Sequence, residues 1–367
     1  MKMLVMAGGT GGHVFPALAV AKALREQGVD VLWMGTRNGF EARAVPAAGF
    51  DIEWIDVAGV RGKGWRSMLA APLRILRAVW QAQRIIRAFQ PRLVLGMGGY
   101  AAGPGGLAAG LLRVPLVIHE QNAAPGTTNK LLSRMATQVL QAYPSAFASL
   151  PRARTVGNPV RAELSALAQP DERGTGTHEP LRILILGGSG GALSLNRTVP
   201  AALAGLTDRV HIRHQAGRTL AAAQQAWDEA DVADPEAVAL SAFIDDMAEA
   251  LSWADVLICR AGALTLAELA MVGVGSILVP FPHAIDDHQT RNAEHLVAAG
   301  AAVLMPEAQL SATGLREQVE SLLADRARLQ DMARAARQCA HPLATTQIAD
   351  VCRRYLGLPP QLDEVAA

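Results

Sequence analysis

The feature that most constrains this chain is a glycine-rich loop between an apolar segment and a helix-forming segment near its first residue. Leu4 to Met6 is a short apolar run, typical of a buried parallel strand. The glycine-rich residues 8–12 follow, and a helical pattern then runs from Pro16 to Gln27, with Gly28 after its end. This pattern predicts a strand, a loop and a helix start, and glycines let such a loop approach a ligand without a Cβ in the way.

The predicted loop suits a phosphate or a developing anion, because a helix N-terminus offers unpaired N–H groups and partial positive charge. It differs from two common phosphate-binding loops. The third glycine of the dinucleotide-binding fingerprint would fall on Val14, and no Gly-Lys-Ser/Thr sequence follows the loop. A tight turn without a ligand is the alternative that the loop alone leaves open.

Composition limits the class of protein. The 367 residues predict two domains of ~150 residues each, and half of the residues are hydrophobic, which fits a large α/β core. A net charge of +1 gives no reason to expect nucleic-acid binding. Cys259, Cys339 and Cys352 form no CxxC motif, so a reducing cytoplasm and buried, inert thiols are expected.

Apolar runs alternate with helical patterns along the chain, which predicts parallel sheets with helices on both faces. In the first half, strands are expected at Val29–Met34, Asp51–Val57, Arg92–Met97 and Pro115–His119, and helices at about Asn38–Ala48 and Pro72–Phe89. Leu93–Leu112 is uncharged and about as long as a membrane helix, but its glycines and Pro104 predict a strand, a loop and a helix start instead.

The opening pattern occurs a second time. Leu181–Leu186 is a buried strand, and the glycine-rich residues 187–192 lead into a helix. Later strands are expected at Val210–His214, Val238–Phe243, Asp255–Cys259, Gly275–Pro280 and Ala302–Met305. The segment 169–180 is polar and is expected to be a surface loop. The fold class is therefore α/β, with two doubly wound parallel-sheet domains, each with a glycine loop at the carboxyl edge of its sheet.

One stretch is strongly basic. Residues 57–119 contain no Asp or Glu but nine Arg or Lys, so this stretch at +9 leaves −8 for the rest of the chain. In the helix expected at Pro72–Phe89, an extra apolar stripe is bordered by arginines; the residues are Leu73, Leu76 and Trp80 with Arg74 and Arg77. The stripe predicts contact with an anionic membrane surface, and a wide buried face with solvated arginines is the alternative.

Eight motifs extend over almost the whole chain: GGTGGHVFP at 8–16, GMGGYAAGPGG at 96–106, HEQN at 119–122, GNPVR at 157–161, GGSGGA at 187–192, FIDDM at 243–247, CRAGALTLAE at 259–268 and DDHQTRNA at 286–293. In this order and spacing they closely resemble the MurG family, bacterial UDP-N-acetylglucosamine (UDP-GlcNAc) transferases of peptidoglycan synthesis. The resemblance implies the GT-B fold, two Rossmann-like domains facing across a cleft. It also implies transfer of N-acetylglucosamine to the 4-hydroxyl of the muramyl sugar of lipid I, giving lipid II at the cytoplasmic face of the cell membrane.

The resemblance also implies roles for individual residues. The substrate contacts that it implies are Thr10, Gly11, Gly12, Asn122, Arg161, Ser189, Ile244, Ala263, Leu264, Thr265, Leu266, Ala267, Glu268 and Gln289. Among these, Arg161 and Ser189 are expected near the UDP diphosphate and Glu268 at the ribose. Gly98, Gly99 and Tyr100 belong to the loop expected to take the acceptor diphosphate. A carboxylate near a helix start is also common without any ligand, so Glu268 keeps that second interpretation.

His13 is predicted to be the general base, because it lies beside the reacting hydroxyl in the resemblance and directly follows the glycine loop. A histidine that only hydrogen-bonds the loop is the alternative, with Glu120 or water as the base. The chain contains no Asp-x-Asp motif, so no metal and no other cofactor is expected, and helix dipoles with Arg161 would stabilise the leaving UDP. The enzyme is expected to be an inverting transferase.

The rigid turn GNPVR at 157–161 predicts the crossing between the two domains. With the substrate roles that the resemblance implies, residues 1–160 and a C-terminal helix at about 342–360 are expected to bind the acceptor and the membrane, and residues 161–341 are expected to bind UDP-GlcNAc. The protein is expected to be a peripheral membrane protein. Two other functions are consistent with the motifs: a UDP-N-acetylglucosamine 2-epimerase with a soluble substrate, and a nucleotide-sugar-binding subunit without activity of its own.

Overall fold

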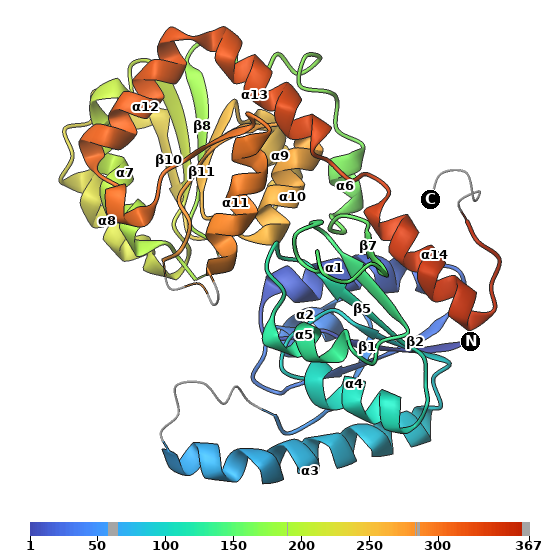
Figure 1. Ribbon diagram of the computed structural model, residues 1–367. Coiled ribbons are helices and arrows are strands. Elements are labelled where there is room, and N and C mark those ends of the chain that lie inside the picture. Colours follow the sequence, from blue (N-terminus) through green and yellow to red (C-terminus); the bar gives the residue numbers. More distant parts are fainter. Residues whose placement is uncertain (58–64, 189, 283, 285–286, 362–367) are drawn as a thin grey trace. The chain divides into compact units, whose positions relative to one another are not determined.

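The computed structural model describes residues 1–57, 65–188, 190–282, 284 and 287–361. The chain divides into two compact units. The first unit consists of Met1–Arg161 and His341–Ala367, and the second consists of Ala162–Ala340. Each unit is built around one parallel sheet (Figure 1).

The sheet of the first unit has the strand order β3-β2-β1-β4-β5-β6-β7. Its strands are β1 (Lys2–Met6), β2 (Asp30–Gly35), β3 (Asp51–Trp54), β4 (Leu93–Gly96), β5 (Leu116–Glu120), β6 (Gln138–Gln141) and β7 (Ala153–Thr155). All neighbouring strands are parallel, which confirms the predicted doubly wound sheet.

Helices cover both faces of this sheet (Figure 1). One face holds α1 (Gly11–Arg25), α2 (Glu41–Ala47) and α14 (Ala344–Leu356), and the other holds α3 (Trp65–Phe89), α4 (Ala102–Leu111) and α5 (Thr127–Leu132). Alternate residues of β1 supply the two cores: Met3 and Val5 pack toward α1 and α14, and Leu4 and Met6 toward α3 and α4.

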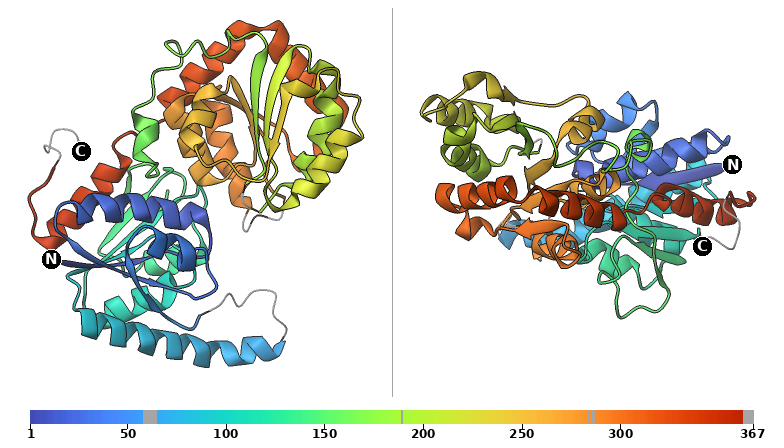
Figure 2. Two further views of the ribbon diagram at one scale, coloured as in Figure 1. Left: turned by 180° about the vertical axis from the view of Figure 1, so that it is seen from behind. Right: turned by 90° about the horizontal axis from the view of Figure 1, so that it is seen from above.

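The C-terminal helix α14 belongs to the first unit. It lies against α1, as Figures 1 and 2 show, and buries Ile348, Val351, Cys352 and Leu356 in the core beside β1. Burial raises the pKa of the Cys352 thiol to about 12, and that of Cys259 likewise, so both are inert thiols as predicted. Cys339, also predicted to be buried, is only half-buried.

The predicted start of the first helix was wrong. The helix begins at Gly11, five residues before Pro16, and Pro16 lies inside it. Thr10 is extended, with φ −132° and ψ 160°, and its carbonyl accepts hydrogen bonds from the N–H groups of His13 and Val14. The first turn is therefore made by the glycines and His13, and the side chain of His13 belongs to the helix itself.

The second unit repeats the plan of the first. Its sheet has the order β10-β9-β8-β11-β12-β13, again all parallel, with β8 (Leu181–Leu186), β9 (Val210–Gln215), β10 (Val238–Ser241), β11 (Val256–Cys259), β12 (Gly275–Leu278) and β13 (Ala302–Leu304). Its helices are α6 (Ala162–Ser165), α7 (Leu193–Leu203), α8 (Leu220–Asp228), α9 (Met247–Trp253), α10 (Ala263–Val272), α11 (His288–Ala298), α12 (Ala312–Ala324) and α13 (Arg326–Gln338). In Figure 1, α7, α8 and α12 lie on one side of this sheet and α9, α10 and α11 on the other.

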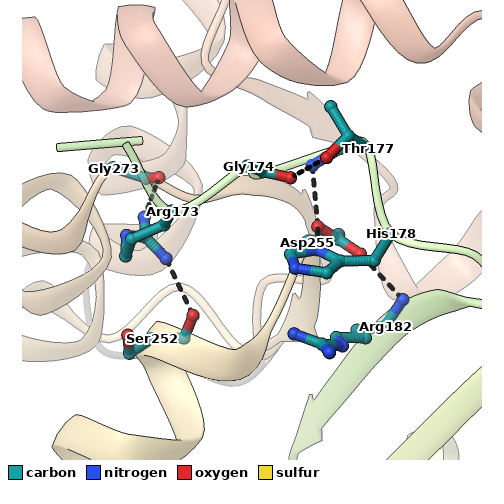
Figure 3. A network of polar contacts seen from close by, with 9 residues as sticks. Arg173, Gly174, Thr177, His178, Arg182, Ser252, Asp255 and Gly273 are labelled. Carbon is teal, nitrogen blue, oxygen red and sulfur yellow. Dashed lines mark hydrogen bonds and ion pairs between the residues drawn. The ribbon is translucent and has the colours of Figure 1, made fainter. Parts of the chain in front are cut away.

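The segment 169–180 was predicted to be a surface loop, and the structure fixes it by hydrogen bonds to buried groups. The buried carboxylate of Asp255 accepts hydrogen bonds from the backbone N–H groups of Gly176 (2.7 Å) and Arg182 (3.0 Å) and from Nδ1 of His178 (2.8 Å) (Figure 3). The Arg173 guanidinium donates to the carbonyl oxygens of Ser252, Val272 and Gly273. Asp255 precedes β11, so this cluster lies at the amino edge of the sheet, opposite the edge where parallel sheets bind ligands.

Among the described residues, no helix is both long enough and apolar enough to cross a membrane. Leu93–Leu112 forms β4, a loop and α4, as the glycines and Pro104 predicted.

Candidate functional site

Three loops meet at the carboxyl edge of the first sheet. Met6 pairs with Gly96 on β4, and Gly96 pairs with Ile118 on β5, so these strands end side by side. The contact between the first two loops is close: Gly99 has φ +88°, and a Cβ on it would lie 2.3 Å from the carbonyl oxygen of Gly8. Only glycine fits at position 99, because any side chain would collide with backbone.

The first glycine loop is held by a carboxylate that the sequence analysis missed. Glu41 is fully buried, and its Oε2 accepts the N–H of Gly9 at 2.8 Å. Its Oε1 accepts the N–H and the hydroxyl of Thr36, at 2.9 and 2.7 Å. The Gly9 N–H is therefore already occupied, and this loop has fewer free N–H donors for an anion than its glycines predicted. An acidic residue at a helix start was the only local signal, and it is too common to identify such a role.

His13 is the third residue of α1 and is half-buried. Its Nδ1 lies 2.9 Å from Oε1 of Gln121, in the HEQN segment that follows β5. A Cβ on Gly98 would lie 2.8 Å from the same Nδ1, so the backbone of the second loop also lies against the ring. The structure thus brings His13, Gly98 and Gln121 together.

Both carboxylate oxygens of Glu120, the alternative base, already accept hydrogen bonds from neighbouring residues. It is buried, and its Oε1 accepts the backbone N–H (3.0 Å) and the side-chain amide (3.1 Å) of Asn122. Its Oε2 accepts the N–H of Gly126 (3.1 Å) and the amide of Asn129 (2.9 Å). These four donors occupy both carboxylate oxygens and organise the loop after β5, which argues against Glu120 as a base toward a substrate.

The other predicted residues of the first unit lie around the same edge. Thr10 is exposed before α1, with Gly11 and Gly12 in its first turn. Tyr100 is 53% exposed in the second loop. The Arg161 guanidinium lies 5.5 Å from the ring centre of Phe15 on α1, which turns it toward the helix that begins with the glycine loop.

The predicted membrane residues lie on α3, the helix that packs on the same face of the sheet as α4 and α5. Leu73, Leu76 and Trp80 are 72%, 64% and 54% exposed, while Ala82 and Ile86 on the other side of the helix are buried. Arg77 pairs with Asp56 at 3.0 Å, an acid that immediately precedes the acid-free stretch. The extra apolar stripe is therefore open to solvent in the first unit.

The second unit has its own glycine loop, after β8. Its Gly188 N–H donates to Oε1 of Gln215 at 3.0 Å, and Nε2 of Gln215 donates to the carbonyl oxygens of Gly188 (3.2 Å) and Ala242 (2.9 Å). A Cβ on Gly217 would lie 2.3 Å from the Gly188 carbonyl oxygen. The predicted contact Ser189 lies in this loop, outside the described residues.

The predicted nucleotide residues of the second unit lie on or near α10. Ala263 is its first residue, Leu264 to Ala267 complete its first turn and enter the second, and Glu268 is buried in the second turn. Ile244 is half-buried in the segment between β10 and α9. The Gln289 Oε1 accepts the Phe281 N–H at 2.9 Å, which joins α11 to the segment after β12.

Arg260 was missed as a site candidate. It follows β11 and donates to the carbonyl oxygens of Val279 (3.1 Å) and Pro280 (3.2 Å) and to the Ser194 hydroxyl (3.0 Å). It also pairs with Glu307. These contacts tie together the carboxyl ends of β11 and β12 and the start of α7, so Arg260 shapes the edge that carries the second glycine loop.

Comparisons with known proteins decide the family. Residues 3–141 match the model of the glycosyltransferase family 28 N-terminal domain, and residues 182–349 match that of the family 28 C-terminal domain. A curated relative from Alkalilimnicola ehrlichii is 57% identical over 96% of this chain and 98% of its own length. It is named UDP-N-acetylglucosamine--N-acetylmuramyl-(pentapeptide) pyrophosphoryl-undecaprenol N-acetylglucosamine transferase. The chain belongs to the MurG family.

Solved structures agree with this membership. The crystal structure of Acinetobacter baumannii MurG is 43% identical, covers 96% of this chain and 99% of its own, and has a TM-score of 0.82. The two Rossmann-like parallel sheets of this MurG-family chain are thus the GT-B fold that the resemblance implied. The crystal structure of a protein from Listeria monocytogenes named "putative UDP-N-acetylglucosamine 2-epimerase" covers 97% of this chain and 96% of its own, with a TM-score of 0.68. Its sequence is only 16% identical, which shows a shared fold alone.

Proposed function

We propose that this chain transfers N-acetylglucosamine from UDP-GlcNAc to the 4-hydroxyl of the muramyl sugar of lipid I, giving lipid II for peptidoglycan. The observation that supports this most directly is the 57% identity, over nearly the full length of both chains, to a transferase of that name. The epimerase shares the fold at 16% identity, which does not support an epimerase function here.

His13 is proposed as the general base. The oxygen of the acceptor 4-hydroxyl forms a bond to the anomeric carbon of the sugar, the bond from that carbon to the UDP oxygen breaks, and the hydroxyl proton passes to the imidazole. Attack opposite the leaving group inverts the anomeric centre. The position of the ring supports this role: it lies at the carboxyl edge of the first sheet, against the loop of Gly98, and ligands of parallel sheets bind at that edge.

The second unit is proposed to bind UDP-GlcNAc. Its glycine loop leads into α7, and the Arg260 contacts tie this helix start to the ends of β11 and β12. The N-termini of α7 and α10 are proposed to supply partial positive charge for the diphosphate, with Ser189 in the loop before α7. The buried carboxylate of Glu268 is proposed to accept hydrogen bonds from the ribose, with Ile244 at the uracil and Gln289 at the sugar. Arg161 and Asn122, which the family resemblance also assigns to the donor, belong to the first unit.

The first unit is proposed to bind the acceptor and the membrane surface. Gly98, Gly99 and Tyr100 would meet the diphosphate of lipid I. The exposed stripe Leu73, Leu76 and Trp80 would enter the interface of an anionic bilayer, with the arginines of α3 at the headgroups. The protein would then act as a peripheral protein at the cytoplasmic face of the cell membrane.

A transfer assay tests the proposed reaction. Purified protein is mixed with radiolabelled UDP-GlcNAc and a short-chain lipid I analogue, and lipid-linked label and free UDP are measured together. We expect both to rise in equal amounts and only when the acceptor is present. Conversion of UDP-GlcNAc to its 2-epimer without an acceptor, with or without release of UDP, would establish an epimerase, and binding without any turnover would establish a non-catalytic subunit.

Vesicle sedimentation tests the membrane surface. We expect binding to anionic vesicles that weakens with salt, because each basic residue near such a surface adds about 1 kcal/mol. Replacing Leu73, Leu76 and Trp80 together by serine should abolish it. Leu343→Ser is the control, because Leu343 is also exposed but lies outside α3. Equal binding of the triple variant, or equal binding to neutral and anionic vesicles, would contradict the proposal.

A further inference from the structure

A chain of hydrogen bonds leads from the backbone of the first unit to His13. Its first member is the carbonyl oxygen of Gly157, which lies 2.9 Å from Nε2 of His119. The opposite ring nitrogen of His119, Nδ1, lies 3.1 Å from Nε2 of Gln121. Oε1 of Gln121 lies 2.9 Å from Nδ1 of His13. We call Gly157, His119, Gln121 and His13 the histidine relay.

The direction of every bond in the relay follows from its first member. A backbone carbonyl only accepts, so Nε2 of His119 carries a proton. Burial lowers the pKa of His119 to about 4, so the ring is neutral at pH 7 and its Nδ1 holds a lone pair. That lone pair accepts from the amide nitrogen of Gln121, which leaves the amide oxygen for His13.

The orientation of the Gln121 amide is supported by neighbouring contacts. Its nitrogen also approaches the His119 carbonyl oxygen at 3.4 Å, and a reversed amide would set its oxygen against that carbonyl oxygen and against the His119 lone pair. The Asn158 amide donates to the Gln121 carbonyl oxygen at 3.0 Å, which restrains the backbone. Both Gln121 and His119 are buried, so water does not compete for these groups.

We infer that His119 and Gln121 are positioning residues that hold His13 in the tautomer protonated on Nδ1, so that Nε2 is the atom that takes the proton from the acceptor. The inference rests on the proposed role of His13 as the base. The contact of Gln121 with Nδ1 agrees with it, because Nε2 is then the ring nitrogen left for a substrate. An amide oxygen sets the tautomer without the negative charge that a carboxylate partner would add.

Nitrogen NMR of the whole protein labelled with ¹⁵N-histidine tests the inference directly at pH 7.5. The chain has nine histidines, and His13 is assigned by comparison with His13→Gln. We expect a pyrrole-type shift for Nδ1 of His13 and a pyridine-type shift for Nε2. The reverse pattern in the unmodified protein would overturn the inference, and this measurement requires no variant of the relay to fold.

Gln121→Met removes the relay while keeping the side-chain length. We expect His13 to change to a mixture of tautomers, kcat to fall by about 10²-fold, and the Kd for UDP-GlcNAc to stay the same. Gln141→Met is the matched control: Gln141 is a buried glutamine on β6 with its own two partners, Thr155 and Phe147, outside the relay.

Two outcomes separate this inference from the proposed function. An unchanged His13 tautomer and unchanged kcat in Gln121→Met would overturn the relay even if His13→Ala is inactive. The predicted tautomer together with full activity of His13→Ala would support the relay as the source of the tautomer and overturn the role of His13 as base.

Discussion

Each of the two units holds its first glycine loop with one side chain, and the charge of that side chain differs between them. In each, a glycine loop follows the central strand and lies so close to a second loop that a Cβ on Gly99 or Gly217 would be only 2.3 Å from a carbonyl oxygen of the first loop. The first loop is held by the carboxylate of Glu41, and the second by the neutral amide of Gln215. A carboxylate beneath a loop favours a nearby positive charge and disfavours an anion, whereas an amide leaves the helix dipole of α7 uncancelled.

The units also share a buried histidine with a defined tautomer. In the second unit, the Trp227 indole N–H donates to Nδ1 of His214 (3.1 Å), and Nε2 of His214 faces Oδ1 of Asn196 (3.0 Å). The Asn196 amide then donates to the Ala216 carbonyl (2.9 Å), so this path ends on backbone. The relay of the first unit ends on the titratable ring of His13.

We therefore propose different chemistry for the two units. The first combines a carboxylate-held loop with a histidine relay that ends at His13, the proposed base, which suits proton transfer. The second combines an amide-held loop with a purely structural histidine, which suits binding a diphosphate. Four experiments follow: three can contradict this division, and the acid-unfolding experiment tests the buried histidines that the units share.

The largest effect is expected for His13→Ala. General base catalysis is worth ~10²–10⁴-fold, so turnover should fall by about that factor while UDP-GlcNAc still binds through the second unit. Transfer kinetics with calorimetric titration of the donor measure both quantities. Turnover within a few-fold of the parent across pH 6–9 would remove proton transfer from the first unit.

Acid should destabilise both units through their buried histidines. Burial lowers the pKa of His119 and of His214 from 6.5 to about 4. Between pH 6.5 and pH 4 the unfolded chain binds protons that the folded chain does not. The contribution of each ring to the free energy of unfolding is therefore complete above pH 6.5 and is lost as the pH falls toward 4. The loss is roughly 3 kcal/mol for each ring.

Urea unfolding between pH 7 and pH 4.5 measures this loss. His214→Gln should remove its share of the pH dependence. His211→Gln is the control, because His211 is exposed on the same strand, β9, and stays in water in both states. An unchanged pH dependence in His214→Gln would show that this ring is not held neutral by burial.

Glu268→Ala should weaken donor binding more than it slows turnover at saturation. Loss of a buried charged acceptor of ribose hydrogen bonds costs roughly 1.5–3 kcal/mol. Its effect is thus the opposite of that expected for His13→Ala, and the pair tests the division of labour between the units. An unchanged Kd for UDP-GlcNAc would exclude Glu268 from the nucleotide site.

We call Glu41 and Gln215, the side chains that hold the two glycine loops, the loop clamps. Exchanging their charges should give the smallest effects. Gln215→Glu sets carboxylate oxygens against the carbonyls of Gly188 and Ala242 and adds negative charge beneath the second loop, which should weaken UDP binding by roughly 1–3 kcal/mol. Glu41→Gln should lower turnover and leave UDP affinity unchanged. If Gln215→Glu binds UDP as well as the parent, the charge of the clamp does not distinguish the units.

Much of the fold was predictable because it depends on local patterns. The strand expected at Leu181–Leu186 has the same bounds in the structure, and the repeated strand–glycine loop–helix pattern predicted both sheets. The extra apolar stripe of α3 was also predicted, because the side of a helix follows from spacing alone. The start of α1 was not, because the extended Thr10 allows two glycines and His13 to form a helical turn before Pro16.

The contacts that organise the site join residues far apart along the chain. Gly9 and Glu41 are separated by 32 positions, and His13 and Gln121 by 108. No local pattern specifies such pairs, because they depend on the register of several strands and on the turn of each loop. The polar segment 169–180 shows the same limit: its composition predicted a surface loop, and the buried Asp255 holds it in place.

The sequence by itself determined the two α/β sheets, the family, the glycine loops and His13 as a candidate base, because periodicity, glycine content and motif order are properties of the chain as written. Only the tertiary structure decided which side chain holds each loop, that Glu120 is occupied by four donors, and which nitrogen of His13 faces Gln121. The physical reason is that hydrogen bonds depend on distances of a few ångströms and on the direction of each donor, and these are set when separate strands are brought into register.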